Sequence, residues 1–204
     1  MRATYRFIMI IFLTLNTFTT TLILPATGGE PSPALANPGQ TPVTSQTAND
    51  IPSFKAFVDS VANGSNLVTG VYVDGLFAYR VLQTGNAVPS GWGVVGQYAR
   101  AKKNIGLLAH NYAAGAKFHE LKPGMKVKIV YGNRKVRTFT VKKIDRYQAS
   151  DPQDLSDPFI HTQSGKQISA KGLFKTMYSS GVTFQTCITQ NGASTWGLLF
   201  VRAK

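Results

Sequence analysis

The chain is nearly devoid of cysteine. Cys187 is the single thiol among 204 residues, so an intramolecular disulfide is excluded. In an exported protein, a lone thiol is either a small buried apolar side chain or a reactive nucleophile. The neighbouring Gln185 and Thr186 are polar, which favours the nucleophile.

Acidic residues are also scarce. Nine Asp and Glu face 22 Lys and Arg, giving a formal net charge of +13. A surface this basic favours anionic partners such as wall polymers, phospholipid head groups or acidic peptides, although a simple solvated surface is the plainer alternative. The cations are scattered and are not interleaved with an aromatic platform, so we expect no nucleic-acid partner.

The first 36 residues have the pattern of an export segment. Residues 1–6 contain Arg2, Arg6 and no acid, and residues 7–24 are apolar or hydroxylic apart from Asn16. This pattern predicts either a signal peptide, cleaved after residues 34–36, or an N-terminal membrane anchor. In both cases the two arginines predict that the rest of the chain lies outside the cell, either membrane-anchored or secreted.

A tether and one domain follow. Residues 37–50 are rich in Pro, Gly, Ser and Thr and have almost no large apolar side chain, which is typical of a flexible linker. The remaining residues, 51–204, have the size of one ordinary domain, and no internal repeat is evident.

The patterns in this domain are mostly those of strands. Apolar or alternating segments occur at residues 67–73, 77–82, 92–98, 104–110, 125–131, 136–144, 182–189 and 195–201. The dipeptides Asp74-Gly75 and Asn191-Gly192 are hairpin signals. Residues 52–61 and 169–179 have helical spacing. About eight short strands with one or two short helices predict an all-β fold, a closed or nearly closed barrel.

A nucleophilic thiol needs a base or a cation beside it, and histidine is the usual partner. His110 follows a predicted buried strand and opens into a loop, which suits a site at a barrel rim. His119 lies on a turn that we expect to point it outward, and His161 follows a Pro-containing loop. His110 is therefore the candidate, with a structural histidine as the alternative.

Six short stretches occur in a characteristic order: Leu107-Leu108-Ala109-His110-Asn111, Phe118-His119-Glu120-Leu121-Lys122-Pro123-Gly124, Tyr147-Gln148-Ala149, Thr183-Phe184-Gln185-Thr186-Cys187-Ile188, Ser194-Thr195-Trp196-Gly197 and Leu199-Phe200-Val201. Together they resemble the sortase family over roughly residues 67–201. The resemblance implies an eight-stranded sortase barrel. It also implies a cysteine transpeptidase that cuts a signal such as Leu-Pro-x-Thr-Gly between Thr and Gly. The implied partners are secreted proteins that bear the signal and an amine on peptidoglycan or a pilin.

The resemblance assigns roles to individual residues. Cys187 matches the nucleophile that holds the peptide as a thioester, and His110 matches the histidine that protonates the leaving amine and deprotonates the incoming one. Thr186 matches a residue that helps to position the substrate. Leu198 stands in the substrate site where an arginine is expected.

That arginine is the one departure from the pattern. Arg202 lies on the same face of the strand, but four residues displace it by roughly 13 Å, so it reaches the site only through a register shift or bulge. Arg146 and Arg80 are the alternative donors. Losing an oxyanion donor costs ~10²–10³ in rate, so the chain is alternatively a weakened sortase-like barrel that binds wall peptides, or a Cys-His hydrolase.

A signal-like motif near the N-terminus and an acidic loop are two further features of the sequence. Residues 24–28 read Leu-Pro-Ala-Thr-Gly, the family's own signal, but they follow the apolar segment instead of preceding one. We take this as chance, with a self-cleaved or pseudosubstrate tether as the alternative. Asp151, Asp154 and Asp157 share a loop in which calcium is conceivable, but their spacing is not that of an EF-hand. A solvated loop is favoured, so we expect no metal and no cofactor.

Overall fold

The computed structural model describes residues 51–101, 104–151, 154, 156–189 and 196–204. These residues belong to a compact unit that spans residues 42–204. The predicted export segment and tether lie outside the described residues. Among the residues that are described, no helix is long and apolar enough to cross a membrane.

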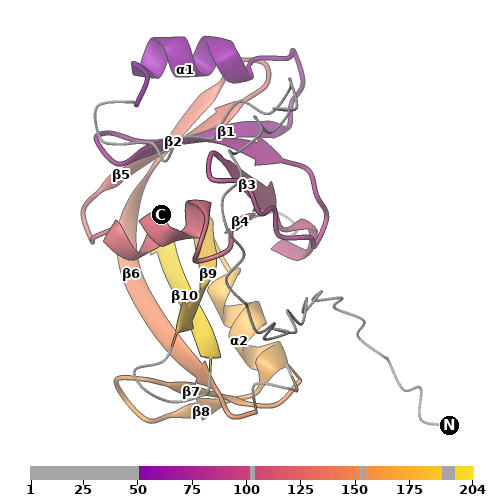
Figure 1. The fold of residues 1–204 in the computed structure, drawn as a ribbon, viewed down its shortest axis with the longest axis vertical. Helices are drawn as coiled ribbons and strands as arrows, with labels where there is room; N and C mark the ends of the chain where they lie inside the picture. Colours follow the sequence, from indigo (N-terminus) through magenta and orange to yellow (C-terminus); the bar gives the residue numbers. More distant parts are fainter. Residues whose placement is uncertain (1–50, 102–103, 152–153, 155, 190–195) are drawn as a thin grey trace, which may run out of the picture. The chain divides into compact units, whose positions relative to one another are not determined.

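Eight strands close into a barrel (Figure 1). They are β1 (Val68–Val73), β2 (Phe77–Leu82), β3 (Val94–Gln97), β4 (Ile105–Leu108), β5 (Lys126–Tyr131), β6 (Val136–Ala149), β9 (Val182–Thr189) and β10 (Trp196–Ala203). Their order is β10-β9-β4-β3-β2-β1-β5-β6, and pairing of β10 with β6 closes the ring. Two short strands, β7 (Phe159–His161) and β8 (Gln167–Ile168), extend the sheet beyond β6. The predicted eight-stranded barrel is confirmed.

Short helices fill the connections. The α-helices are α1 (Phe54–Val61) and α2 (Ala170–Met177), and the 3₁₀ turns include η2 (Ala99–Ala101) and η3 (Ala114–Glu120). Serine begins both α-helices: the Ser53 hydroxyl accepts from the Ala56 N–H, and Ser169 accepts from the Gly172 N–H. Each serine satisfies a backbone donor that the first helical turn leaves free.

Two hairpin turns contain a residue in the left-handed region, and one of them is the predicted Asp74-Gly75 turn. Gly75, between β1 and β2, has φ +68°, and Arg134, between β5 and β6, has φ +67°. Left-handed φ is easy for glycine and uncommon for other residues. The predicted Asn191-Gly192 turn lies outside the described residues, although β9 and β10 pair as the antiparallel hairpin it implies.

The barrel carries apolar layers on both faces of its sheet. Its interior is filled by side chains such as Leu107, Phe184 and Leu199, none of them exposed. A second cluster lies on the outer face of β9, β10 and β6, where Leu173 and Met177 of α2 pack with Phe200. Figure 1 shows α2 lying along β9 and β10, with β7 and β8 at the end of the molecule opposite α1. The outer layer therefore forms a cover on one side of the barrel.

An irregularity in β6 decides which side chains reach this layer. Arg202 pairs with Lys143, but the next residue of β10 pairs with Val141, so one residue of β6 is skipped. Val141 packs inside the barrel, whereas Tyr147, an even number of positions further along, packs in the outer layer. A bulge that inserts one residue re-aims the side chains after it. Here it turns Asp145 and Tyr147 toward α2.

Candidate functional site

The register of β4 against β9 points to His110 as the neighbour of Cys187. The pair is parallel, with Ile105 opposite Val182 and Leu108 opposite Gln185, a constant offset of 77 (182 − 105). One more ladder bond, from the Ala109 N–H to the Gln185 carbonyl, continues it past the end of β4. The same offset carries His110 to position 187 (110 + 77). Continued to these positions, the register aligns the two residues on one face of the sheet, about one strand spacing apart.

A row of side chains continues across the sheet from this pair. Cys187 pairs with Leu198 on β10, Leu198 pairs with Tyr147 on β6, and Tyr147 pairs with His161 on β7. Residues paired in register project from the same face. The row therefore reads His110, Cys187, Leu198, Tyr147, His161, and it brings together three residues that the sequence analysis singled out.

The Cys187 thiol is half-buried and packs against the outer apolar layer. Burial raises the pKa of this thiol above its ordinary value of 9.0, because a low-dielectric surrounding disfavours the thiolate. At neutral pH the sulfur is therefore protonated, and it needs a proton acceptor before it can attack a carbonyl.

His110 is held by its loop and by an aromatic ring. Its carbonyl accepts hydrogen bonds from the N–H groups of Ala113 and Gly115, both at 3.0 Å, which fixes the turn after β4. Its half-buried imidazole stacks on the ring of Tyr112, with centroids 4.9 Å apart and planes inclined by 13°. The imidazole thus stands at the barrel rim with one face covered.

Thr186 lies on the other face of β9 from Cys187. It is 3% exposed, and its hydroxyl has no hydrogen-bond partner among the described residues. A Cβ on Gly115 would stand 2.3 Å from this hydroxyl and 2.6 Å from the His110 carbonyl oxygen. Thr186 therefore packs under the loop that carries His110, and only glycine fits at position 115.

His119 is a residue of the site whose role the sequence analysis did not identify. It lies on η3, which packs against β9, and its ring hydrogen-bonds the backbone carbonyl of Cys187. The pKa of His119 is lowered, first by burial and also by the nearby Arg146, while the hydrogen bond acts in the opposite direction. His119 is exposed, as expected, while the neighbouring Phe118 and Leu121 are buried. No sequence pattern indicates that the exposed His119 interacts with the backbone of β9.

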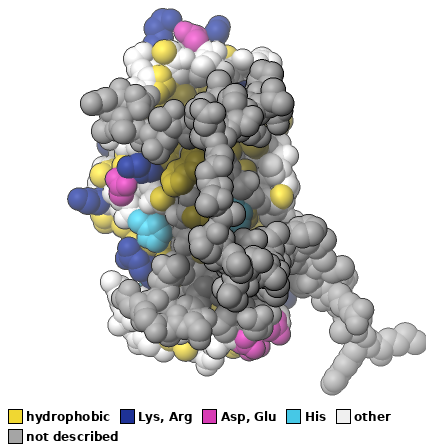
Figure 2. All heavy atoms as spheres, in the orientation of Figure 1, with side chains coloured by type: hydrophobic (Ala, Val, Ile, Leu, Met, Phe, Trp, Pro, Cys, Tyr) yellow, Lys and Arg dark blue, Asp and Glu magenta, His cyan; other side chains and the backbone are white. Residues whose placement is uncertain are grey.

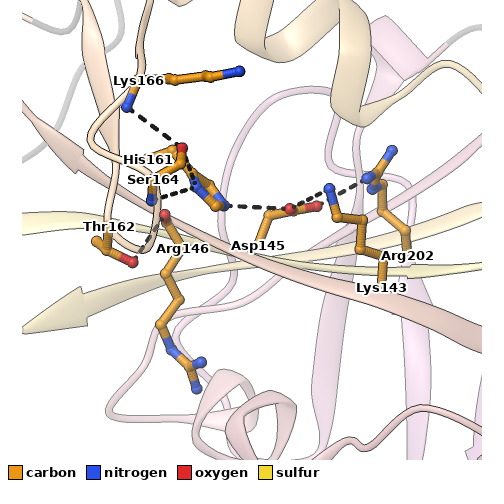
Figure 3. A network of polar contacts seen from close by, with 8 residues as sticks. All are labelled: Lys143, Asp145, Arg146, His161, Thr162, Ser164, Lys166 and Arg202. Carbon is orange, nitrogen blue, oxygen red and sulfur yellow. Dashed lines mark hydrogen bonds and ion pairs between the residues drawn. The ribbon is translucent and has the colours of Figure 1, made fainter.

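Arg202 is engaged elsewhere. Its Nη2 donates to Oδ2 of Asp145 at 2.9 Å, and the Asp145 side chain is 1% exposed. Figure 3 shows both side chains on the same side of the sheet. Arg202 pairs with Thr183 across β9, four residues along β10 from Leu198. It therefore neutralises a buried carboxylate at a distance from the sulfur.

The same carboxylate has two further basic neighbours. Lys143 Nζ lies 2.9 Å from Asp145 Oδ1 without hydrogen-bond alignment, and His161 Nε2 lies 3.5 Å from the same oxygen. On its other side the His161 ring meets Ser164, whose Oγ is 2.9 Å from Nδ1. Figure 3 shows this chain of contacts from β10 through β6 to the turn after β7. Asp145 thus ties the end of β7 to the barrel.

Of three comparisons with known proteins, the one with solved structures finds similar proteins. No protein-family model matches the chain, and no curated protein matches it. Among solved structures, sortase A from Listeria monocytogenes is 12% identical, covering 69% of this chain and 88% of its own, with a TM-score of 0.38. Sortase C from Clostridium perfringens SM101 is 10% identical over 77% and 93%, with a TM-score of 0.41. Sortase E1 from Streptomyces coelicolor is 18% identical over 70% and 90%, with a TM-score of 0.37.

All three of these structures are sortases. At these identities a similar fold says nothing about activity, substrate or partners, which depend on the residues of the site itself. In this barrel the candidate residues are those of the row that begins with His110 and Cys187.

The alternative arginines do not lie beside the sulfur in the row. Arg146 follows Asp145 on β6, and Figure 3 shows its guanidinium on the opposite side of the strand from the Asp145 carboxylate. Arg80 lies on β2, opposite Val94 of β3. Strands β3 and β4 separate β2 from β9, a distance of roughly 14 Å at the usual strand spacing. On β10, the residue paired with Cys187 is Leu198, which is 3% exposed.

The described residues contain no cluster of three or more His, Cys, Asp or Glu arranged to hold a metal ion. In the acidic loop, the Asp154 carboxylate accepts hydrogen bonds from the N–H and hydroxyl of Ser156, and these lower its pKa. Lysine and arginine are likewise dispersed: on the face that Figure 2 shows, their described side chains lie at separate places. The described surface in this view offers no single basic platform.

Proposed function

We propose that this sortase-like barrel is an exported cysteine transpeptidase that cleaves a Leu-Pro-x-Thr-Gly-like signal. The observation that supports the proposal is the parallel register of β4 and β9, which, continued two residues past the end of β4, aligns His110 with Cys187. A thiol and an imidazole on neighbouring strands, on one face, are the groups that thioester chemistry requires.

The proposed reaction follows from the two groups. The Cys187 thiol passes its proton to His110 and its sulfur attacks the scissile carbonyl. The protonated imidazole then gives this proton to the leaving amine, which departs as the peptide bond breaks and the thioester remains. An incoming amine attacks the thioester, gives up a proton to His110 and releases the sulfur, which regains its hydrogen.

The proposed site is weak in one respect. A tetrahedral intermediate needs a donor directed at its oxyanion, and the residue opposite the sulfur is Leu198. Leu198 therefore favours a second candidate, a barrel that binds wall peptides with little cleavage.

The partners belong to the same proposal. They are secreted proteins that carry the signal, and an amine on peptidoglycan or a pilin. The placement outside the cell rests on Arg2, Arg6 and the apolar residues 7–24, with the chain either anchored or secreted.

A single assay separates the candidates. The full chain in detergent is given a fluorogenic Leu-Pro-x-Thr-Gly peptide with and without triglycine as the amine. A transpeptidase yields the amine adduct and a detectable thioester on Cys187, whereas a hydrolase yields the free acid only. A binding barrel shows peptide affinity without either product. Turnover that persists in Cys187→Ala contradicts all the cysteine mechanisms.

A further inference from the structure

Tyr112 combines two properties that rarely occur together at a rim. Its side chain is exposed, with 62% of its surface open to solvent, and yet its ring lies nearly parallel on His110, with centroids 4.9 Å apart. Exposed aromatic rings are normally free to turn, because nothing packs against them. This ring instead stacks on the imidazole of the residue two positions earlier in the chain.

Within the described part of the chain, His110 has no hydrogen-bonded partner of the kind that usually orients such a residue. A histidine that moves protons is normally held by a hydrogen bond from its second ring nitrogen to a carboxylate or carbonyl, which fixes the ring plane. Among the described residues, no hydrogen bond reaches either ring nitrogen of His110. The Asp145 carboxylate does lie beside a histidine, but that histidine is His161 and not His110.

We propose that Tyr112 is a positioning residue for His110 and orients by stacking an imidazole that no other described residue holds by a hydrogen bond. This proposal rests on the proposed transpeptidase function. Two rings inclined by 13° overlap through their faces, so both nitrogens, which lie in the plane of the imidazole, stay free. A stacked ring restricts rotation about the side-chain bonds and leaves the whole edge of the imidazole available for proton transfer.

The loop geometry supports the assignment. The His110 carbonyl is fixed by the N–H groups of Ala113 and Gly115, and Gly115 packs without room for a Cβ between Thr186 and that carbonyl. The backbone at position 110 is therefore rigid, and the rotation of the imidazole is the freedom that remains. Tyr112, within this same loop, removes that freedom.

The experiment compares the full chain in detergent with Tyr112→Ala and Tyr112→Phe, the variant that keeps the ring. The protein has three histidines, so its ring Cε1–H signals in NMR are few. The signal of His110 is the one that persists in both His119→Gln and His161→Gln. We expect an upfield-shifted His110 signal with a high order parameter in the native chain and in Tyr112→Phe. In Tyr112→Ala the signal moves downfield and the order parameter falls.

Kinetics provides the second readout. Tyr112→Ala should lower kcat roughly two- to tenfold with KM little changed, the range expected for one aromatic pair. Tyr112→Phe should keep native kcat. Leu67→Ala, another exposed apolar residue at 55%, is the control and should change neither readout.

The outcomes separate this proposal from the function on which it rests. An unchanged His110 order parameter in Tyr112→Ala overturns the positioning role, and so does an unchanged kcat when the signal has moved. If the native chain has no turnover, the proposed function fails, and the order parameter alone decides whether Tyr112 orients His110.

Discussion

Leu198 lies directly opposite Cys187 in the antiparallel pair of β9 and β10. Directly paired residues have Cβ atoms ~5 Å apart, so whatever stands at position 198 sets the field at the sulfur. In this chain it is a buried aliphatic side chain. The raised pKa of the Cys187 thiol agrees with that surrounding, since burial is its cause.

Placing a cation at this position should activate the thiol. In Leu198→Arg, a guanidinium within reach of the sulfur favours the thiolate and offers a donor to the oxyanion. We expect faster alkylation of Cys187 at pH 7.5 and a kcat/KM on the Leu-Pro-x-Thr-Gly peptide that rises about tenfold or more. Leu198→Met, which keeps volume without charge, is the control. A native chain that is already fast, and that Leu198→Arg slows, would show that another group fills the role.

The pH dependence of Cys187 alkylation tests the burial of the thiol. Because the folded pKa is raised, the rate of reaction with iodoacetamide should still be climbing above pH 9. The same chain in urea, where the thiol is solvated, should level off at lower pH. Cys187→Ala should take up no label, since the chain has no second cysteine. A folded midpoint below that of the urea sample would mean that a cation lies near the sulfur.

Much of the barrel was predictable from sequence because its signals are local. Asp74-Gly75 marks a tight turn, and Ser53 and Ser169 mark helix starts at which the first turn lacks acceptors. Cys187 and His110 could also be identified from the sequence, because a lone thiol and a histidine after a buried strand can each be recognised separately. Their alignment depends on the register of β4 and β9, which no local sequence pattern encodes.

The rest of the site depends on contacts between distant segments. The bulge in β6 that turns Asp145 toward α2 leaves no mark in the alternation of the strand. The pairing of Asp145 with Arg202 joins residues 57 positions apart, and His161 has no local pattern that indicates its role. Such contacts arise from how strands are staggered in a closed barrel, and single-sequence patterns carry no information about that stagger.

His119 should make the fold sensitive to mild acid. Its pKa is lowered in the folded chain, so the unfolded chain binds the proton more readily and stability falls as pH drops through the ordinary range of histidine toward the folded value. His119→Gln keeps a side-chain N–H donor but does not titrate. The loss of unfolding free energy between pH 7.5 and pH 5, from urea titrations, should therefore be smaller in His119→Gln. An equal loss in both proteins would place the acid sensitivity elsewhere.

The Asp145–Arg202 pair should be the most costly polar contact to break. Asp145 is 1% exposed and the Arg202 side chain 17%, and removing one partner from a buried pair costs ~3–5 kcal/mol because the other charge is left uncompensated. We expect Asp145→Asn and Arg202→Met each to lower the free energy of unfolding by roughly 3 kcal/mol in urea titrations. The double variant should lose less than the sum of the two.

Lys143 provides the matched comparison for this cycle. It contacts the same carboxylate at 2.9 Å, but its side chain is 61% exposed, and exposed ion pairs contribute ~0–1 kcal/mol. Lys143→Met should therefore be nearly neutral, although it removes a cation at the same distance. If Lys143→Met costs as much as Arg202→Met, or if the losses of Asp145→Asn and Arg202→Met simply add, burial is not what makes this pair strong. The tie between β6 and the end of β7 would then have to come from apolar packing around Tyr147 and Phe200.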